Sequence, residues 1–217
     1  AIGKVTRLTG EWYQPIEEDR RWFVAPRLDV QGRNQPVFAT SDLRAFEFRR
    51  ESGEVRLTAG RLVGDLGEVA VAPFRRRSRY ALRTGGLGAI GEDAGIDTLS
   101  TAGLEATLYL DALDAPDFPT AGWLLQARHA AYLEGLGSDV EANASGLDWV
   151  SAFGPGEASL LLRARLRYAD SLELPEEVVF LGGFQTLSGY SEDALFGRMS
   201  AFGSATWYQP IGGFLRY

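Results

Sequence analysis

The sequence predicts an all-β protein, built as an antiparallel transmembrane β-barrel. Three observations support this fold class. Apolar and polar residues alternate with a period of two along most of the chain, as in strands whose two faces meet different surroundings. The expected strands are usually about 10 to 15 residues long, whereas about five or six residues are common in soluble sheets. The connections alternate between short turns and long loops, which is typical of an outer-membrane barrel.

Composition excludes several other classes of protein. The chain has 217 residues, enough for one large β domain or two small ones, and we treat residues 1–217 as one barrel domain. Its net charge of −7 argues against a nucleic-acid partner, because no basic excess is present to neutralise phosphates. The absence of cysteine excludes disulfides and thiolate metal sites. No run approaches the roughly 18 apolar residues of a membrane helix, whereas barrel strands need no such run.

The alternation places the strands one after another along the whole chain. We expect them at 4–16, 20–32, 37–50, 54–63, 67–76, 79–88, 99–111, 122–133, 140–152, 158–170 and 196–210, with a partial strand at 213–217. Because the first residue is Ala and the last residues resemble the start of a strand, we expect the chain to be an interior piece of a longer barrel, with strands missing at both ends.

Each well-patterned strand has an apolar and a more polar face. Within 22–30 the even-numbered residues are apolar, while the other face carries Arg27 and Asp29. Within 104–111 the even-numbered residues are again apolar, opposite Glu105. In an outer-membrane barrel the apolar faces meet lipid and the polar faces line the lumen. We therefore expect an apolar belt outside and a polar lumen that contains arginines.

The connections fall into two sets. The short ones are expected at 17–19, 51–53, 153–156 and 212, and the long ones at 85–98, 134–139 and 171–195. In outer-membrane barrels the short turns are periplasmic and the long loops extracellular. This arrangement predicts that 171–195 is an extracellular loop.

Two motifs in the second half of the chain are specific in combination. The first is a turn that contains Asp111, Asp114, Phe118, Pro119 and Gly122. The second comprises Leu181, Gly182, Gly183 and Phe184, followed by Leu187, Ser188, Gly189 and Tyr190. Glycine allows close backbone approach and positive φ, and the aromatic rings need somewhere to be buried. Without the flanking strands, a long hairpin loop with its own apolar cluster would be the simpler interpretation.

In order and spacing the two motifs resemble those of the bacterial surface-antigen superfamily, which includes outer-membrane barrel-assembly insertases and two-partner secretion transporters. The first is similar to its Asp-x-x-Asp…Phe-Pro-x-x-Gly periplasmic turn. The second is similar to its Gly-Gly…Val-Arg-Gly-Phe/Tyr loop, which folds back into the lumen. The resemblance implies a barrel of about sixteen strands, of which our count gives this chain about twelve. The segment from Leu187 to Gly197 looks most like the barrels of patatin-like phospholipase type Vd autotransporters.

The lumen loop departs from the family pattern at one position. Ser188 stands where the family has an arginine that contacts an acidic group on the barrel wall, so that charge-assisted contact is lost. The inward face of 158–170 offers Arg163, Arg165 and Arg167 as possible wall partners. We expect Tyr190 and Phe184 to pack the loop tip into the lumen. We expect Gly189 to permit the close approach.

Three apparent sites are better explained without catalysis or a ligand. Gly86, Gly88 and Gly91 match a dinucleotide pattern but are not followed by a helix. The aspartates of the first motif lack the glycine and glutamate of a calcium loop, and their side chains fit a turn with local acceptors. His129, the single histidine, lies in an alternating strand, and no G-x-S-x-G is present. We therefore expect no cofactor, metal or catalytic residue in this chain.

The predicted function is to anchor, and to translocate, an attached domain at the bacterial outer membrane. The resemblance implies an upstream patatin-like lipase, whose nucleophile would precede Ala1. The expected partners are outer-membrane lipid, the barrel-assembly machinery during insertion, and the upstream domain. An assembly or polypeptide-secretion barrel preceded by polypeptide-transport repeats is the main alternative. A soluble β-sandwich binding module is the second, and it requires the apolar faces to meet in one dry core.

Overall fold

The structure, a computed structural model, describes residues 5–16, 18, 21–40, 43–84, 97–154, 158–183, 186–187, 189–190 and 195–209. The partial strand predicted at 213–217 lies outside these residues, as do Phe184 and Ser188 of the lumen-loop motif. No helix in the described part of the chain is long and apolar enough to span a bilayer.

The described chain is almost entirely antiparallel β-sheet. One large sheet has the order β1-β3-β4-β5-β6-β7-β8-β9-β12, with β2 paired to β3, and β10 and β11 form a small separate sheet. The bounds are β1 Val5–Glu11, β2 Gln14–Pro15, β3 Trp22–Thr40, β4 Leu43–Val63, β5 Gly67–Thr84, β6 Asp97–Asp111, β7 Ala121–Tyr132, β8 Ala142–Phe153, β9 Ser159–Ala169, β10 Val179–Leu181, β11 Leu195–Gly197 and β12 Met199–Tyr208, with a 3-10 turn η2 at Glu134–Leu136.

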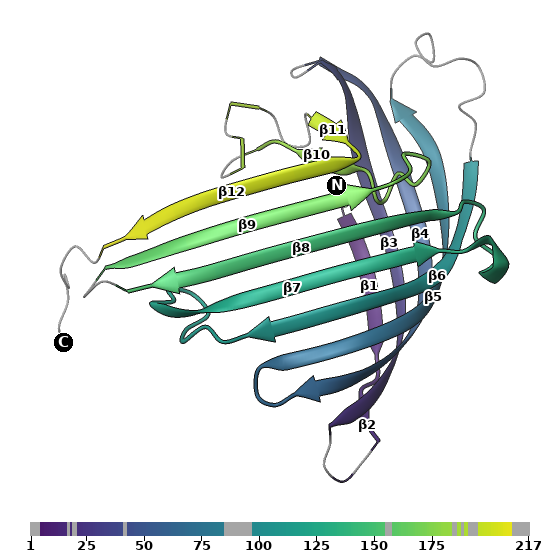
Figure 1. Cartoon of the computed structure of the whole chain (residues 1–217). Helices are drawn as coiled ribbons and strands as arrows, with labels where there is room; N and C mark the ends of the chain where they lie inside the picture. The colour runs from purple at the N-terminus through teal and green to yellow at the C-terminus, as the bar shows by residue number, and fades with distance from the viewer. Residues whose placement is uncertain are drawn as a thin grey trace, which may run out of the picture.

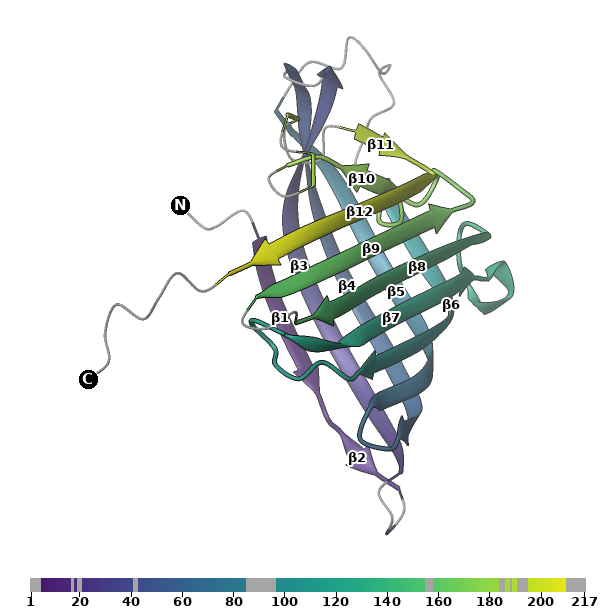
Figure 2. The same cartoon turned by 60° about the vertical axis from the view of Figure 1, so that its left-hand side comes forward.

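The large sheet curves strongly, so that β1, β3 and β4 form one wall and β7, β8, β9 and β12 form another (Figures 1 and 2). Every neighbouring pair of main strands is adjacent in sequence, except that β12 follows β9 after the long connection that contains β10 and β11. The order ends at β1 and β12, and within the described residues these two strands are not paired with each other. The arrangement is that of a barrel wall with two edges.

Three strands are longer than the sequence predicted. The ranges 20–32, 37–50, 54–63, 67–76 and 79–88 were expected to be separate strands, but β3, β4 and β5 run through them as strands of 19, 21 and 18 residues. The predicted turn at 51–53 is therefore wrong. Gly53 pairs with Val30 on one side and Arg77 on the other, so ladder hydrogen bonds continue through a turn-prone sequence. The described residues still form twelve strands, as the sequence predicted, but ten of them make the large sheet and two the small one, so the places of the strands along the chain differ from those expected.

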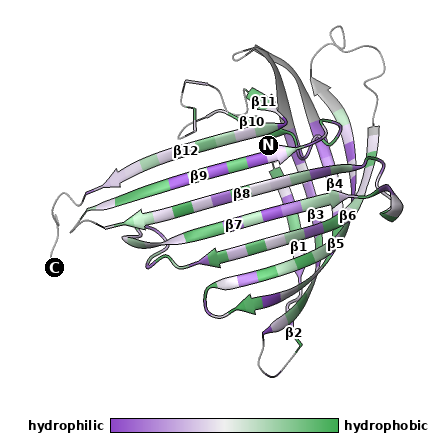
Figure 3. Cartoon of the chain, in the orientation of Figure 1, coloured by the Kyte–Doolittle hydropathy of each residue, from purple (hydrophilic) through white to green (hydrophobic). Residues whose placement is uncertain are grey.

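The two faces of the sheet differ as the alternation predicted. On β5, Ala70 and Phe74 on the inner face are 4% and 5% exposed, while Val71 on the outer face is 57% exposed. On β6, the inner Glu105 is 5% exposed and its outer neighbour Leu104 is 49% exposed. Hydrophobic and hydrophilic residues alternate along successive strands (Figure 3). A soluble β-sandwich would bury these outer residues against a second sheet, so that alternative is wrong.

The expected division into short turns at one end and long loops at the other holds only in part, because residues 41–42 alone separate β3 from β4 at the long-loop end, and 112–120 at the opposite end is as long as 133–141. The turn at 64–66 between β4 and β5 closes with a hydrogen bond from the Leu66 amide to the Val63 carbonyl, at 3.1 Å. The connections 112–120 and 154–158 lie at this same end. Those after β5, β7 and β9 are at the other end, and the one after β9 bends back toward the sheet (Figure 1).

Candidate functional site: the lumen and its loop

The inner face of the sheet carries a network of charged side chains. Arg56 on β4 donates to Glu54 at 2.9 Å and also contacts Glu105 on β6. Arg76 on β5 donates to Glu54 at 2.8 Å, and Arg128 on β7 donates to Glu105 at 2.6 Å. Buried charges are tolerated when they are paired and hydrogen-bonded in this way. The two glutamates therefore link three arginines across four adjacent strands.

The loop between β9 and β10 is anchored to the wall, beside this charged network, by Leu174. This side chain is 1% exposed and belongs to an apolar cluster with Phe74, Ala130, Tyr132, Ala142 and Ala144 of the wall. Residues 175–177 then form a turn, in which the Glu177 amide donates to the Leu174 carbonyl at 3.0 Å. Burial of Leu174 places the next turn, and so Glu176 and Glu177, beside the wall arginines.

Glu176 contacts β4 and β5. Its carboxylate accepts a hydrogen bond from Arg76 at 2.7 Å and forms an ion pair with Arg50 at 3.5 Å. The Ser78 hydroxyl also donates to it, at 3.4 Å. The Glu176 side chain is only 4% exposed, so these contacts are made largely out of water.

Glu177 contacts β7. Arg128 donates to both of its carboxylate oxygens, at 2.9 and 2.8 Å, and the Tyr132 hydroxyl also donates to it. A bidentate arginine–carboxylate pair of this kind fixes orientation as well as charge. Burial alone would raise the pKa of the Glu177 carboxyl, but the hydrogen bonds and charge of Arg128 outweigh it. The pKa therefore lies below its ordinary value of 4.5.

Together these contacts make one closed chain of alternating charge. It runs from Glu176 through Arg76, Glu54, Arg56, Glu105 and Arg128 to Glu177. Its two ends are neighbouring residues of the loop, and its middle belongs to the wall. The loop is therefore part of the lumen's charge network and not simply adjacent to it. No motif in the sequence marks Glu176 or Glu177 as site residues. The available signal is an acidic pair in a long loop, beside a lumen expected to contain arginines.

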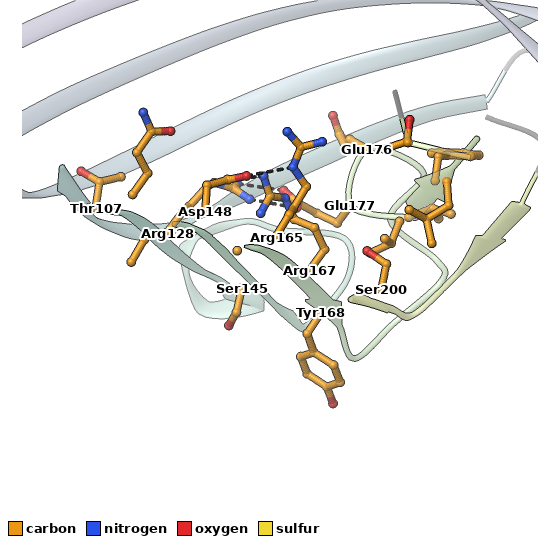
Figure 4. Close-up of a pocket in the computed structure, with 18 of the residues that line it drawn as sticks. Thr107, Arg128, Ser145, Asp148, Arg165, Arg167, Tyr168, Glu176, Glu177 and Ser200 are labelled. Carbon is orange, nitrogen blue, oxygen red and sulfur yellow. Dashed lines mark hydrogen bonds and ion pairs between the residues drawn. The ribbon is translucent and has the colours of Figure 1, made fainter. Parts of the chain in front are cut away.

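Two of the three arginines expected to contact the loop, Arg165 and Arg167, have another partner. Arg165 donates to Asp148 on β8 at 2.8 Å, and Arg167 contacts the same carboxylate and the Leu147 carbonyl, the latter at 3.1 Å. Arg165 and Arg167 nevertheless face the loop across a cavity of about 730 Å³, which Glu176 and Glu177 also line (Figure 4). Arg163 lines a second cavity, of about 420 Å³, together with Thr186 of the loop. Among the described residues, no ion pair joins these arginines to the loop.

The glycine motif folds as a tight turn within the loop. Gly182 and Gly183 have φ of 143° and 92°, which a residue with a side chain rarely adopts. The Gly183 amide donates to the Tyr190 carbonyl at 3.1 Å, and the Leu187 amide donates to the Gly183 carbonyl at 3.0 Å. These bonds pair Gly183 with Leu187, whereas Leu181 pairs with Leu195 of β11.

Of the two aromatic residues expected to pack the loop tip into the lumen, the structure describes Tyr190. Tyr190 is 45% exposed. A Cβ at Gly189 would meet nothing within 4 Å, so no close approach there requires glycine. The glycine requirement lies instead at Gly182 and Gly183. The contact expected for Phe184 and the role of Ser188 fall outside the described residues.

The turn motif at the other end of the strands is held by local hydrogen bonds. Asp114 accepts from the Thr120 amide at 2.9 Å, the Thr120 hydroxyl at 2.6 Å and the Ala121 amide at 3.1 Å, and these bonds lower the pKa of its carboxyl. Asp111 accepts from the Leu113 amide at 2.9 Å. The described residues contain no group of three or more His, Cys, Asp or Glu that could hold a metal ion.

The rest of the turn motif fixes where the turn meets the strands. Gly122 has φ of 99°, and a Cβ there would lie 2.0 Å from the Ala112 carbonyl oxygen. Phe118 packs edge-on against Tyr208 of β12, with ring centroids 5.8 Å apart. The Pro119 carbonyl accepts from the Ser159 hydroxyl at 2.6 Å. The turn is thereby tied to β9 and β12, which flank the lumen loop.

Comparison with known proteins adds the fold to this description. No family model and no curated protein matches the chain. The crystal structure of BamA from Haemophilus ducreyi, lacking POTRA domains 1–3, matches with a TM-score of 0.77 and 13% sequence identity. The match covers 99% of this chain and 46% of the BamA chain, so this chain spans less than half the length of that protein. At this identity the likeness shows the fold, which is that of the BamA β-barrel.

Proposed function

We propose that this chain is the barrel of a bacterial outer-membrane protein, and that it anchors an attached domain at the cell surface and carries that domain across. The single observation behind this proposal is the two-sided wall. Its outer face is apolar and exposed, and its inner face is charged and filled by a loop. An isolated soluble protein rarely leaves such an apolar surface open to water. A closed β-barrel is the form in which strands satisfy their backbone groups in lipid.

The outer face has the character that lipid contact requires. Val55 and Leu57 on β4 and Val69 and Val71 on β5 are 62%, 49%, 44% and 57% exposed. In a bilayer each of these side chains would be transferred from water to hydrocarbon, with a gain of about 25 cal/mol per Å² of apolar surface. Trp22 lies near the turn end of β3, where Arg61 stacks over its ring at 5.5 Å. Aromatic and cationic side chains of this kind are enriched at the membrane–water interface.

The ion pairs between the loop and the lumen wall favour a passage that opens when the loop is released over a permanently open pore. Glu176 and Glu177 fix the loop to three wall strands, and the loop therefore occupies space that a translocated chain would need. Movement of an attached domain through the lumen then requires release of these ion pairs. The resemblance to patatin-like autotransporter barrels suggests a lipase as the attached domain, with the barrel-assembly machinery as the partner during insertion.

The proposal is tested with the full-length protein, expressed with its own leader in a Gram-negative host. We expect it in the outer-membrane fraction, with the heat-dependent shift in gel mobility typical of folded barrels. We expect the attached domain to be cleaved by protease added to intact cells. A heat-shifting barrel whose attached domain stays protected in intact cells would rule out surface anchoring. Absence of the protein from the membrane fraction would rule out the barrel itself.

The second candidate is an assembly or secretion barrel, and the likeness to the BamA fold favours it. Its distinguishing experiment is depletion of the protein from its native host. An assembly barrel would lower the amounts of many unrelated outer-membrane proteins, and a secretion barrel would leave one exported polypeptide in the periplasm. An anchor would do neither. Sequencing the upstream domain provides an independent test, because a G-x-S-x-G α/β unit supports the anchor and small repeated αβ modules support the alternative.

A further inference from the structure

The outer face of β1, β3, β4 and β5 contains a groove that the proposed function does not use. It has a volume of about 760 Å³. One row of paired residues crosses the groove. It runs from Leu8 on β1 to Val30 on β3, then to Gly53 on β4 and Arg77 on β5. One end is therefore apolar, the middle lacks side chains and the other end is basic.

The glycines open the middle of the groove. A Cβ placed on Gly53 would meet nothing within 4 Å, so the space above it is open. A Cβ on Gly32 would lie 3.2 Å from the Arg49 guanidinium, which shows that Arg49 reaches over this glycine. Leu8 and Val30 are 73% and 49% exposed at the apolar end. The groove thus offers an apolar surface directly beside guanidinium groups.

The basic end has more positive than negative charge. Arg75, Arg77 and Arg79 occupy alternate positions of β5, and all three face outward and are exposed. Arg77 and Arg79 line the groove together with Arg49 and a single acidic residue, Glu51, which Arg49 contacts at 2.7 Å. Within the described part of the chain, Arg77 has no ion pair. The groove therefore presents guanidinium groups with free hydrogen-bonding capacity.

The position of these arginines identifies the chemistry of the partner. Residues that precede them on the same face of β5 are apolar, so the arginines lie where lipid-facing side chains give way to the long-loop end. An arginine that faces hydrocarbon is costly unless an anion is within reach. The long-loop end of an outer-membrane barrel faces the outer leaflet. Arginine is well suited to phosphate, because its planar donors can bind two oxygens at once.

We propose that this groove binds the phosphorylated glycolipid of the outer leaflet, lipid A. Its phosphates would contact Arg77 and Arg79, and an acyl chain would lie over Val30 and Leu8. The inference rests on the proposed location in the outer membrane and adds a specific lipid site to it. Phosphate alone would satisfy the arginines but not cover the apolar end, so a lipid headgroup matches the groove better than a free anion.

The test uses the full-length protein folded in detergent and measures binding of diphosphoryl lipid A by native mass spectrometry. The variant R77Q/R79Q should bind it about 10- to 30-fold more weakly, the effect of losing two cationic contacts with an anionic lipid surface. The charge-retaining variant R77K/R79K should keep most of the affinity. The matched control is Arg61→Gln, which removes an outward arginine at the turn end of β4 and should leave affinity unchanged.

Two further ligands separate the possible results. The wild type should bind dephosphorylated lipid A weakly, with an affinity close to that of R77Q/R79Q for diphosphoryl lipid A. Excess inorganic phosphate should not displace diphosphoryl lipid A from the wild type. Equal binding of both lipids, or no loss in R77Q/R79Q, would overturn the inference. So would displacement by phosphate at concentrations similar to the lipid. A heat-dependent gel shift checks that each variant is a folded barrel, so failure of the lipid site remains distinct from failure of the proposed function.

Discussion

The two motif-bearing connections of this protein, the turn after β6 and the loop after β9, are held by opposite means. In the turn, Asp114 bonds to Thr120 and Ala121, its near neighbours in sequence. In the loop, Glu176 and Glu177 bond to Arg76 and Arg128, which lie 100 and 49 residues earlier. The turn can form from its own residues, whereas the loop needs a finished wall. Local contacts specify the turn, and tertiary contacts specify the loop.

This difference predicts how each connection responds to mutation. Removing a loop carboxylate takes one of two acidic partners from a wall arginine, which is a long-range defect. Changing a residue that closes the turn, such as Gly122, should strain mainly the turn itself, since the contacts of the turn with β9 and β12 are made by Pro119 and Phe118. The predictions that follow start with the largest expected effect.

The largest effect should come from removing both loop carboxylates. The variant E176Q/E177Q leaves Arg76 with Glu54 and Arg128 with Glu105 but replaces the loop carboxylate of each by a neutral amide, and losing charge-assisted hydrogen bonds at two sites costs about 3 kcal/mol in all. We expect faster hydrogen exchange across 171–183 and a lower urea midpoint for the folded protein in detergent. The matched control is Glu173→Gln, because Glu173 is exposed in the same loop. Equal exchange rates in the double variant and this control would show that the ion pairs do not hold the loop.

Substitution of Gly122 by alanine should cost somewhat less. The residue has φ of 99°, and the new Cβ would lie 2.0 Å from the Ala112 carbonyl oxygen, so the turn must shift. Backbone strain of this kind costs about 2 kcal/mol. Gly10→Ala is the control, since a Cβ at Gly10 meets nothing within 4 Å. Faster hydrogen exchange of the 171–183 loop in Gly122→Ala would show that the two connections are coupled. It would contradict the view that the turn and the loop are held independently.

Acid should release the loop through Glu177. Its carboxyl has a pKa below the ordinary value of 4.5 in the folded protein, because the hydrogen bonds and charge of Arg128 outweigh the opposing effect of burial. Such a group stabilises the folded state at pH values above about 4.5 and loses this contribution as the pH falls through the folded-state pKa. Hydrogen exchange of the loop, corrected for its intrinsic pH dependence, should be constant from pH 7 to about pH 5 and rise below that. In Glu177→Gln the rise in exchange at low pH should be much smaller. A rise as large as that of the wild type would mean that another group causes it.

The smallest effect should come from Tyr190→Ala. The side chain is 45% exposed, and the bonds that close its turn, from the Tyr190 amide and to its carbonyl, belong to the backbone. Substitutions at such positions usually change stability by about 0.5 kcal/mol or less. The urea midpoint should therefore stay close to that of the wild type. A loss comparable to that of E176Q/E177Q would mean that the aromatic tip, and not the carboxylates, holds the loop.

The sequence was sufficient to predict which residues face in and which face out. Alternation in 22–30 and 104–111 assigned Asp29 and Glu105 to the inner face, and both are largely buried there, at 9% and 5% exposure. The side-chain period of a strand is two whatever its neighbours are, so this assignment needs no knowledge of the tertiary structure. For the same reason the fold class could be predicted.

Strand ends and loop contacts could not be predicted in the same way. Ser52 and Gly53 have turn propensity, but pairing with β3 and β5 keeps them in the ladder, because the neighbouring strands supply hydrogen bonds on both sides. The partners of Glu176 lie on β4 and β5, and only the curvature of the sheet brings them to the loop. No local pattern contains that curvature. Asp148, the partner of Arg165 and Arg167, needs no curvature, because it lies opposite Arg165 on the neighbouring strand β8, but its pairing depends on the register of the two strands.

The closed chain of charges that joins Glu176 to Glu177 also constrains the order in which the protein folds. Its wall members come from β4, β5, β6 and β7, so the loop cannot complete this chain of charges until these four strands are paired. Contacts between residues this far apart in sequence form late, since the loop entropy must be lost before the contacts are gained. Docking of the loop should therefore be among the last steps of folding, and a docked loop reports that the wall behind it is complete.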